Sequence, residues 1–460
     1  MTPNISPKYF KNIKTVLHRS TGRPSPTQFK LGGTMRWIQI LFLGIFSCIL
    51  LAGCFDSDKL TTVGDEGETI HVLGVVGVHE AIVESLEKKL AAYHIKVDKN
   101  FYYWGTFLAK ARLSIMNDTR EYDIIMGPCS QFSGIINNNK AVSLEDIAER
   151  VHLTREDLYP SIRKNAIFKN NFFCLPYMAD SLIYIYRTDL FNQAGLKPPH
   201  TIHEMVDTSK KLTSGTNYGL AFPAGPGEAA TPVWSYFLWS YGGDYFDNHW
   251  NPVINSNHAL NATRIYNQIL QECAPAAVAT WQTEEAINFF AAGHLASMIL
   301  WSSSSTTLND KSRNKFANNV GYAPLPVSDI GITIPSMETW GVIIPRTSQH
   351  ILSAKKFCEV LISRPSLEKI AQLGMVPTPL PSINQLYASN SPNSSFTVAT
   401  HSMPFAKENP NIPEANQFIP VIGSALNDIL MGANLDDTLR NANEQIEGIM
   451  QLSGRLKKHK

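Results

Sequence analysis

The chain has 460 residues, and its 44% hydrophobic content, with 22 Phe, 16 Tyr and 8 Trp, is enough for a sizeable core and excludes a wholly disordered protein. The first 53 residues carry seven Lys or Arg and no Asp or Glu, so 33 basic and 39 acidic residues remain and residues 54–460 have a net charge of −6. This mildly acidic body argues against nucleic acid as a partner, and its length predicts two or three domains.

An uncharged apolar segment lies near the N-terminus. Residues 37–53 (WIQILFLGIFSCILLAG) follow Arg36 and end on two small residues, which is the pattern of a secretory signal peptide. The alternative is an uncleaved membrane anchor, but these 17 residues are fewer than the roughly 20 that span a bilayer. Because signal peptides normally begin close to their apolar run, we interpret residues 1–34 as a misassigned start before Met35, with a long basic leader as the alternative.

The end of the apolar segment resembles a lipid-attachment site. Residues 51–54 (LAGC) are similar to the lipobox of bacterial lipoproteins, which implies that residues 1–53 are removed and that Cys54 is acylated. Residues 54–68 are polar and contain glycine, so we expect a lipid-anchored tether. No zinc-type spacing is present and spacing does not pair the other mature cysteines, for which we favour buried thiols over disulfides: Cys129, Cys174, Cys273 and Cys358.

After the tether, strand and helix patterns alternate. Apolar runs with β-branched residues predict strands, and apolar residues at helical spacing predict helices. The predicted order is strand 69–76, helix 81–91, strand 95–103, helix 106–116 and strand 122–126. Short connections between such elements predict a doubly wound α/β sheet, whose ligands bind beyond the carboxyl ends of the strands. Those ends are residues 76–80, 104–106 and 127–131.

The alternation continues in the second half of the chain. Thr201 and Glu204 form a capping box that predicts the start of a helix. Further strands are predicted at 182–186, 295–301 and 340–344, and further helices at 285–292 and 348–362.

An ordered set of segments resembles the bacterial extracellular solute-binding proteins of ABC importers, the maltose-binding-like family. The resemblance covers about residues 69–381. Its segments include YDII (122–125), AVSLED (141–146), LPYMAD (175–180), YIYRTDLF (184–191), FFAAG (289–293), MILWS (298–302) and ETWGVIIP (338–345).

This resemblance implies a two-lobe fold of the type II periplasmic binding proteins, in which each lobe is a doubly wound sheet with flanking helices. A hinge joins the lobes and allows them to close around ligand. On this template lobe 1 comprises residues 69–176 and 340–376, lobe 2 comprises 182–335 and 380–460, and the hinge crossings are 177–181, 336–339 and 377–379.

A binding site for a polar solute needs flat apolar surfaces together with a few fixed polar groups. The strand ends and the family segments give the expected ligand-binding residues: Trp104, Trp234, Trp301, Trp340, Asp180, Glu338, Gln131, Ser302, Tyr177, His79 and Glu80. Core packing is the alternative for each tryptophan. A capping or structural role is the alternative for Asp180, and an ordinary helix start is the alternative for His79 and Glu80.

The resemblance implies capture of a small polar solute, such as a sugar or sugar-like compound, and its delivery to the membrane subunits of an ABC importer. We expect an exported monomer, anchored by lipid on Cys54 and facing the periplasm or cell exterior, without cofactor, bound metal, catalytic residue or nucleic acid. An exported lipid-anchored enzyme is one alternative, although the sequence has no GxSxG, HExxH or Walker motif. A sensory receptor that uses the same fold is the other alternative.

Overall fold

The structure is a computed structural model that describes residues 67–378, 384, 387–388 and 394–456. The predicted signal peptide, Cys54 and all but the end of the tether lie outside the described residues, as does residue 379 in the third predicted crossing. Within the described part, none of the helices combines the length and the apolar character needed to cross a bilayer.

Strands and helices alternate along most of the chain, as the sequence predicts. The strands are β1 (Glu68–Val75), β2 (Ile95–Tyr102), β3 (Ile124–Pro128), β4 (Ile167–Phe168), β5 (Asn171–Phe172), β6 (Leu175–Arg187), β7 (Ser297–Trp301), β8 (Val320–Ala323), β9 (Met337–Ile343) and β10 (Val376–Pro377). The 3-10 helices are η2 (Cys129–Phe132), η3 (Arg155–Asp157), η4 (Ala276–Thr280), η5 (Ser302–Ser304) and η6 (Ala317–Asn319).

The α-helices before residue 241 are α1 (Val78–Ala91), α2 (Trp104–Met116), α3 (Ser133–Asn137), α4 (Glu145–Arg150), α5 (Pro160–Ala166), α6 (Thr188–Gln193), α7 (Ile202–Leu212) and α8 (Thr231–Ser240). Those after residue 241 are α9 (Asn257–Cys273), α10 (Thr283–Ala291), α11 (Ser305–Leu308), α12 (Ile351–Leu361), α13 (Arg364–Gln372), α15 (Ser395–Ser402), α16 (Ala415–Leu430) and α17 (Leu435–Leu452).

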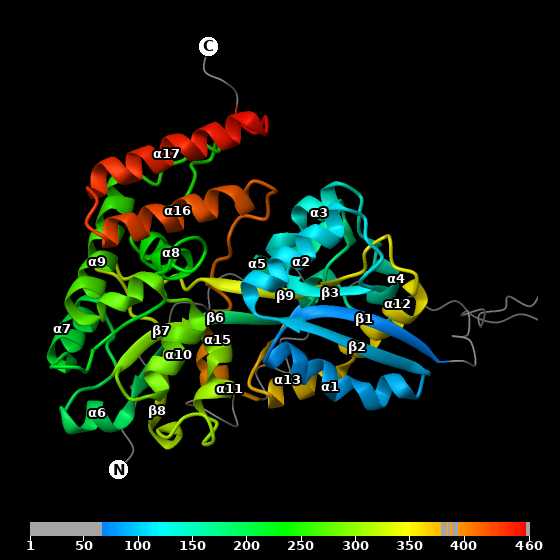
Figure 1. Cartoon of the computed structure of the whole chain (residues 1–460), viewed down its shortest axis with the longest axis horizontal. Coiled ribbons are helices and arrows are strands. Elements are labelled where there is room, and N and C mark those ends of the chain that lie inside the picture. Colours follow the sequence, from blue (N-terminus) through cyan, green and yellow to red (C-terminus); the bar gives the residue numbers. More distant parts are fainter. Residues whose placement is uncertain (1–66, 379–383, 385–386, 389–393, 457–460) are drawn as a thin grey trace, which may run out of the picture. The chain divides into compact units, whose positions relative to one another are not determined.

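The first part of the sheet contains the predicted parallel strands. β1 pairs in parallel with β2 and β3, and all five residues of β3 are buried. α1 and α13 lie on one side of these strands, and α2 and α3 lie on the other (Figure 1). Val72 belongs to a hydrophobic cluster with Ile82 of α1, whereas Leu73 belongs to another cluster with Phe107 of α2. Apolar residues therefore point to both faces, as expected of a doubly wound sheet.

β6 connects this part of the sheet to the rest. Residues 175–181 pair with β9, and residues 182–187 pair with β7 and β8. The sequence predicted only the second half of this strand. The first half contains Pro176, which has no N–H for the ladder, and the register shifts between Pro176 and Met178. The strand continues past this irregularity because the residues on either side of it are buried in the sheet.

The three predicted hinge crossings fall on neighbouring strands. Ala179 of β6 pairs with Thr339 of β9 on one side and with Val376 of β10 on the other. All three segments therefore pass the same place in the sheet. The lobe boundaries and the hinge itself stay a prediction.

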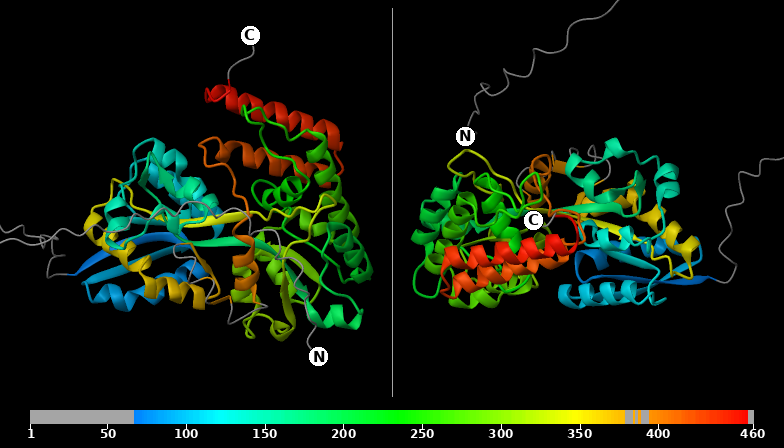
Figure 2. Two further views of the ribbon diagram at one scale, coloured as in Figure 1. Left: turned by 180° about the vertical axis from the view of Figure 1, so that it is seen from behind. Right: turned by 90° about the horizontal axis from the view of Figure 1, so that it is seen from above.

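In the part of the fold that contains β7 and β8, α10 packs on β7 and α15 packs on β8, and further helices extend to the C-terminal end. α7 begins with the predicted capping box, in which the Thr201 side chain accepts a hydrogen bond from the Glu204 backbone N–H. α16 and α17 lie side by side in both views of Figure 2. Both are amphipathic, and their apolar residues, such as Ile422 and Ile446, are buried.

Candidate functional site

Four of the predicted site residues form an aromatic cluster near β6 and β9. The imidazole of His79 lies against the indole of Trp340, with ring centroids 3.9 Å apart, and its Nδ1 is hydrogen-bonded to the Tyr177 hydroxyl at 2.7 Å. Trp104 meets Trp340 edge-on at 6.0 Å. Burial lowers the pKa of His79 to about 3, so the imidazole is neutral at physiological pH. The cluster is an uncharged, flat surface.

Asp180 is held in place by the segment that follows β7. Its Oδ1 accepts hydrogen bonds from the Ser302 hydroxyl at 2.6 Å and from the Ser303 backbone N–H at 3.0 Å. Burial raises the pKa of Asp180, and these hydrogen bonds oppose that shift because they stabilise the carboxylate. Predicted residues 180 and 302 are therefore brought together.

Glu338 lies directly opposite Asp180 in the ladder between β9 and β6. It accepts a hydrogen bond from the Ser130 hydroxyl. Burial raises the pKa of Glu338 to about 7, and repulsion from Glu228 and Asp180 adds to the shift, whereas the bond from Ser130 opposes it. Two carboxylates that the sequence placed near the crossings are thus neighbours.

A further carboxylate, Glu408, lies next to this pair. It accepts a hydrogen bond from the hydroxyl of Thr339, and its other oxygen, Oε2, is buried without a partner among the described residues. Burial raises the pKa of Glu408 well above its ordinary value, and the charge of Glu338 adds to the effect. A buried acceptor without a donor is costly, so this oxygen is suited to receive a hydrogen bond from a bound molecule.

Trp104 and Gln131 are part of a charged contact at the edge of the cluster. Arg112 of α2 lies 3.5 Å from an oxygen of Glu228 and donates a 3.3 Å hydrogen bond to the Gln131 side chain. The indole N–H of Trp104 also bonds to Glu228, while burial raises the pKa of that carboxyl. Gln131 therefore already has a partner in this structure.

The structure does not support a place in this site for Trp234. Its side chain is fully buried in α8, its indole N–H donates to Thr263 of α9 at 2.8 Å, and it stacks near Tyr245. This arrangement favours the core-packing alternative for Trp234, and its role as a ligand contact stays a prediction. Trp301 does end β7 and is partly buried, next to the serines that bind Asp180.

Trp104 and Glu80 lie on helices rather than at strand ends. Trp104 is the first residue of α2, although the sequence placed it at the end of the preceding strand. Glu80 lies in the first turn of α1, where a negative charge favours the helix dipole, and its side chain makes no hydrogen bond or ion pair within the described part of the chain. Its role as a ligand contact stays a prediction.

Sequence reasoning did not identify four polar residues of this site: Ser130, Arg112, Glu228 and Glu408. Glu228 and Glu408 lie in irregular segments outside the family-like motifs, and only the chain's path brings them to Glu338. Ser130 directly follows Cys129 at the end of β3, a position that the strand-end rule covers. The strand-end rule was therefore the one sequence signal that could have identified Ser130.

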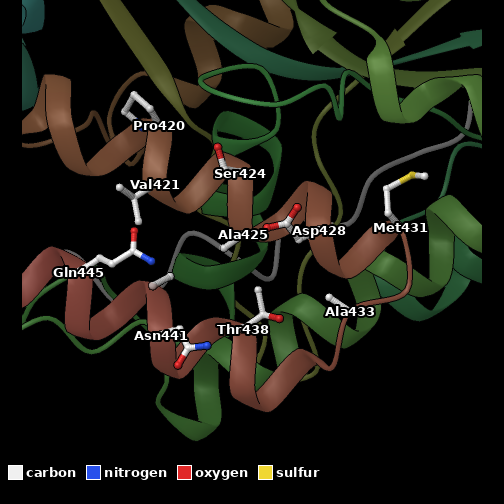
Figure 3. A pocket seen from close by; sticks show the side chains of 11 residues that line it. Pro420, Val421, Ser424, Ala425, Asp428, Met431, Ala433, Thr438, Asn441 and Gln445 are labelled. Atoms are coloured by element: carbon white, nitrogen blue, oxygen red, sulfur yellow. The ribbon is translucent and has the colours of Figure 1, made fainter.

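A concave region lies between α16 and α17, and none of these residues lines it. It has a volume of about 630 Å³, and it is lined by residues of both helices, including Ser424, Asp428, Asn441 and Gln445 (Figure 3). Its size suits a small ligand. However, these four side chains are exposed and no aromatic ring lines the region. We therefore place the candidate solute site at the aromatic cluster and the carboxylates.

Comparison with known proteins decides the family. The profile of the bacterial extracellular solute-binding protein family matches residues 78–366. The chain belongs to this family. A mannitol-binding protein of Pseudomonas aeruginosa is 29% identical over 210 residues, which cover 44% of this chain and 48% of the relative. A probable amino-acid ABC transporter periplasmic-binding protein of Sinorhizobium fredii is 24% identical over 211 residues, which cover 45% of this chain and 48% of the relative.

The similarity to solved structures extends further along the chain. An ABC transporter solute-binding protein of Agrobacterium vitis, solved with bound D-mannitol, superimposes with a TM-score of 0.75 at 20% identity, over 84% of this chain and 99% of the other. This confirms the predicted two-lobe fold. The matches to the two relatives span about half of each relative's length. Members of the family are exported binding proteins of transport systems and not enzymes.

Proposed function

We propose that this solute-binding protein captures a sugar or polyol between its two predicted lobes and delivers it unaltered to the membrane subunits of an ABC importer. The observation that carries the proposal is the stack of His79 on Trp340 beside the paired carboxylates Asp180 and Glu338. The ligands named for the mannitol-binding relative and the D-mannitol complex support the same class of solute.

The chemistry of the site matches a neutral polyhydroxylated molecule. The indole of Trp340 offers a flat apolar face to C–H groups, and carboxylate oxygens such as Oε2 of Glu408 accept hydrogen bonds from hydroxyl groups. Two cations of the described residues flank the site and are already paired, Arg112 with Glu228 and Lys407 with Asp244. The site thus has many acceptors and few free positive charges, which favours a donor-rich solute.

Closure of the lobes is the second part of the proposal. Arg112 is assigned to lobe 1 and Glu228 to lobe 2, so their ion pair connects the two predicted lobes. The hydrogen bond between Trp104 of lobe 1 and Glu228 connects the same two lobes. The adjacent strands β6, β9 and β10 would form the hinge. Solute bound beside Trp340 would then add contacts from both lobes and favour the closed arrangement.

Charge selectivity gives a test of the proposed substrate class. We expect D-mannitol or a sugar of similar size to raise the melting temperature of the purified protein, since a ligand at a hundred times its Kd adds about 2.7 kcal/mol to the free energy of unfolding. The corresponding phosphate ester should bind at least about tenfold more weakly, because its charge would enter a site beside which Arg112 and Lys407 are already paired with carboxylates. Thermal-shift titrations with both compounds measure this difference, and tighter binding of the phosphate ester would contradict the proposal.

The lipid anchor and the monomeric state are further parts of the proposal. Cys54 follows the apolar segment in a lipobox-like sequence, which supports acylation at this residue. In a bacterial host, the native chain should sediment with the membrane fraction, and Cys54→Ala should no longer carry acyl chains in intact-mass spectra. Acylation that persists in Cys54→Ala, or a native precursor without lipid, would exclude this anchor.

A further inference from the structure

Two of the buried cysteines meet inside the first part of the sheet. The sulfur atoms of Cys129 and Cys174 lie 2.8 Å apart, and both side chains are fully buried. Cys129 directly follows β3, and Cys174 directly precedes β6. They are 45 residues apart in the sequence, so chain proximity does not explain their contact.

A glycine of the intervening strand provides the space for this contact. β9 lies between β3 and β6 in the sheet, and its Gly341 pairs with Gly127 on one side and with Pro176 on the other. A Cβ atom at position 341 would lie 2.2 Å from the Cys174 sulfur and 2.6 Å from the Cys129 sulfur. The two cysteines thus reach across β9 through the space that only a glycine leaves open.

We propose that Cys129 and Cys174 form a disulfide bond in the exported protein. A disulfide requires sulfur atoms about 2.04 Å apart, so the two sulfur atoms would need to approach each other by about 0.8 Å, and the ends of β3 and β6, which flank β9, would need to move slightly closer together. Oxidising compartments allow such bonds to persist. Among the described cysteines, Cys129 and Cys174 are the pair whose sulfur atoms meet, whereas Cys273 and Cys358 belong to the other hydrophobic cluster.

The bond would form by thiol–disulfide exchange with an oxidised protein dithiol or with glutathione disulfide. The thiolate of one cysteine attacks the incoming disulfide, and the second cysteine then displaces the carrier from the mixed disulfide. The two cysteines lose two protons and two electrons in total, and the carrier leaves as two thiols. Burial raises the pKa of Cys129 in the folded protein, so exchange belongs to folding, before the sheet closes around the pair.

The position of this bond connects it to the proposed solute site. Cys129 precedes Ser130, whose hydroxyl bonds to Glu338, and Cys174 lies three residues before Tyr177, which bonds to His79. The disulfide would therefore fix the ends of β3 and β6 that carry these two contacts. It would stabilise the folded chain chiefly by limiting the unfolded ensemble.

Differential alkylation of the full chain tests the proposal. Protein purified from an exporting bacterium, and protein refolded with a mixture of reduced and oxidised glutathione, are denatured and alkylated before and after reduction. We expect reduction to expose two additional thiols, which peptide mass spectrometry assigns to Cys129 and Cys174. The proposal is overturned if both residues are alkylated before reduction in both preparations, or if either is linked to a different cysteine. The refolded preparation gives this answer even if export fails.

Matched variants separate the bond from general packing effects. Cys273→Ala should retain the two reducible thiols and a melting temperature that falls by about 5 °C on reduction. The double variant Cys129→Ala, Cys174→Ala should have no reducible pair, and reductant should leave its melting temperature unchanged. An equal response to reductant in both variants would overturn the assignment.

Discussion

Replacing Trp340 by alanine should weaken solute binding by at least tenfold and by up to a hundredfold. The indole lies against His79, with centroids 3.9 Å apart, and meets Trp104 at 6.0 Å, so its removal takes away the centre of the aromatic surface. Buried aromatic contacts of this kind contribute about 1–3 kcal/mol to binding. Trp340→Phe keeps a flat ring and should lose less. Isothermal titration with D-mannitol, or with the tightest solute found, measures both values.

A matched tryptophan provides the control for this prediction. Trp234→Phe removes the indole N–H that bonds Thr263 in the core, so it should lower the melting temperature while the Kd stays within about twofold of the original. A folded Trp340→Ala protein that binds as tightly as the original would place the solute elsewhere. A large loss of affinity in a stably folded Trp234→Phe protein would instead place Trp234 in the solute site.

Replacing Glu338 by glutamine should stabilise the solute-free protein at pH 8 by about 2–3 kcal/mol. Burial raises the pKa of Glu338 from 4.5 to about 7, so the folded protein keeps this proton at pH values where the unfolded chain has released it. Between those values the folded state binds more protons, and the free energy of unfolding therefore decreases as pH rises, then levels off above pH 7. Glutamine can still accept the hydrogen bond from Ser130 and carries no charge.

Urea unfolding from pH 4.5 to 8 measures the effect. The decrease in unfolding free energy across this range should become smaller in Glu338→Gln, with a remaining contribution from Glu408, whose pKa burial also raises. Glu444→Gln, an exposed residue of α17, is the control and should keep the original slope. If the unfolding free energies of Glu338→Gln and Glu444→Gln have the same pH dependence, Glu338 does not have the raised pKa that we assign to it.

Much of the framework could be predicted because its signals are local. β-branched apolar runs predicted β1 and β2 to within a residue or two, and the Thr201–Glu204 capping box predicted the start of α7. The proximity of Asp180 and Glu338 was also accessible, since both lie in family-like segments at the expected crossings. The strands and the capping box depend on spacing and composition, which a single sequence contains, whereas the proximity of Asp180 and Glu338 depends on the family resemblance.

The predictions were weakest where tertiary contacts decide a residue's role. Trp234 was assigned to the site from the family resemblance, yet every residue of α8 except Pro232 is buried, as expected of a helix that is apolar on all sides. Glu228 and Glu408 carry no local pattern, and only their approach to Glu338 makes them part of the site. The contact between Cys129 and Cys174 likewise depends on the position of Gly341 in the sheet.

Calorimetric titration followed by recovery of the solute tests the central claim most directly. Purified protein is titrated with D-mannitol, other polyols and sugars, and the bound compound is then released and analysed by mass spectrometry. We predict saturable binding of at least one of these compounds, with one molecule per chain, and its recovery without chemical change. Saturable binding of none of them, or recovery of a converted product, would contradict the account.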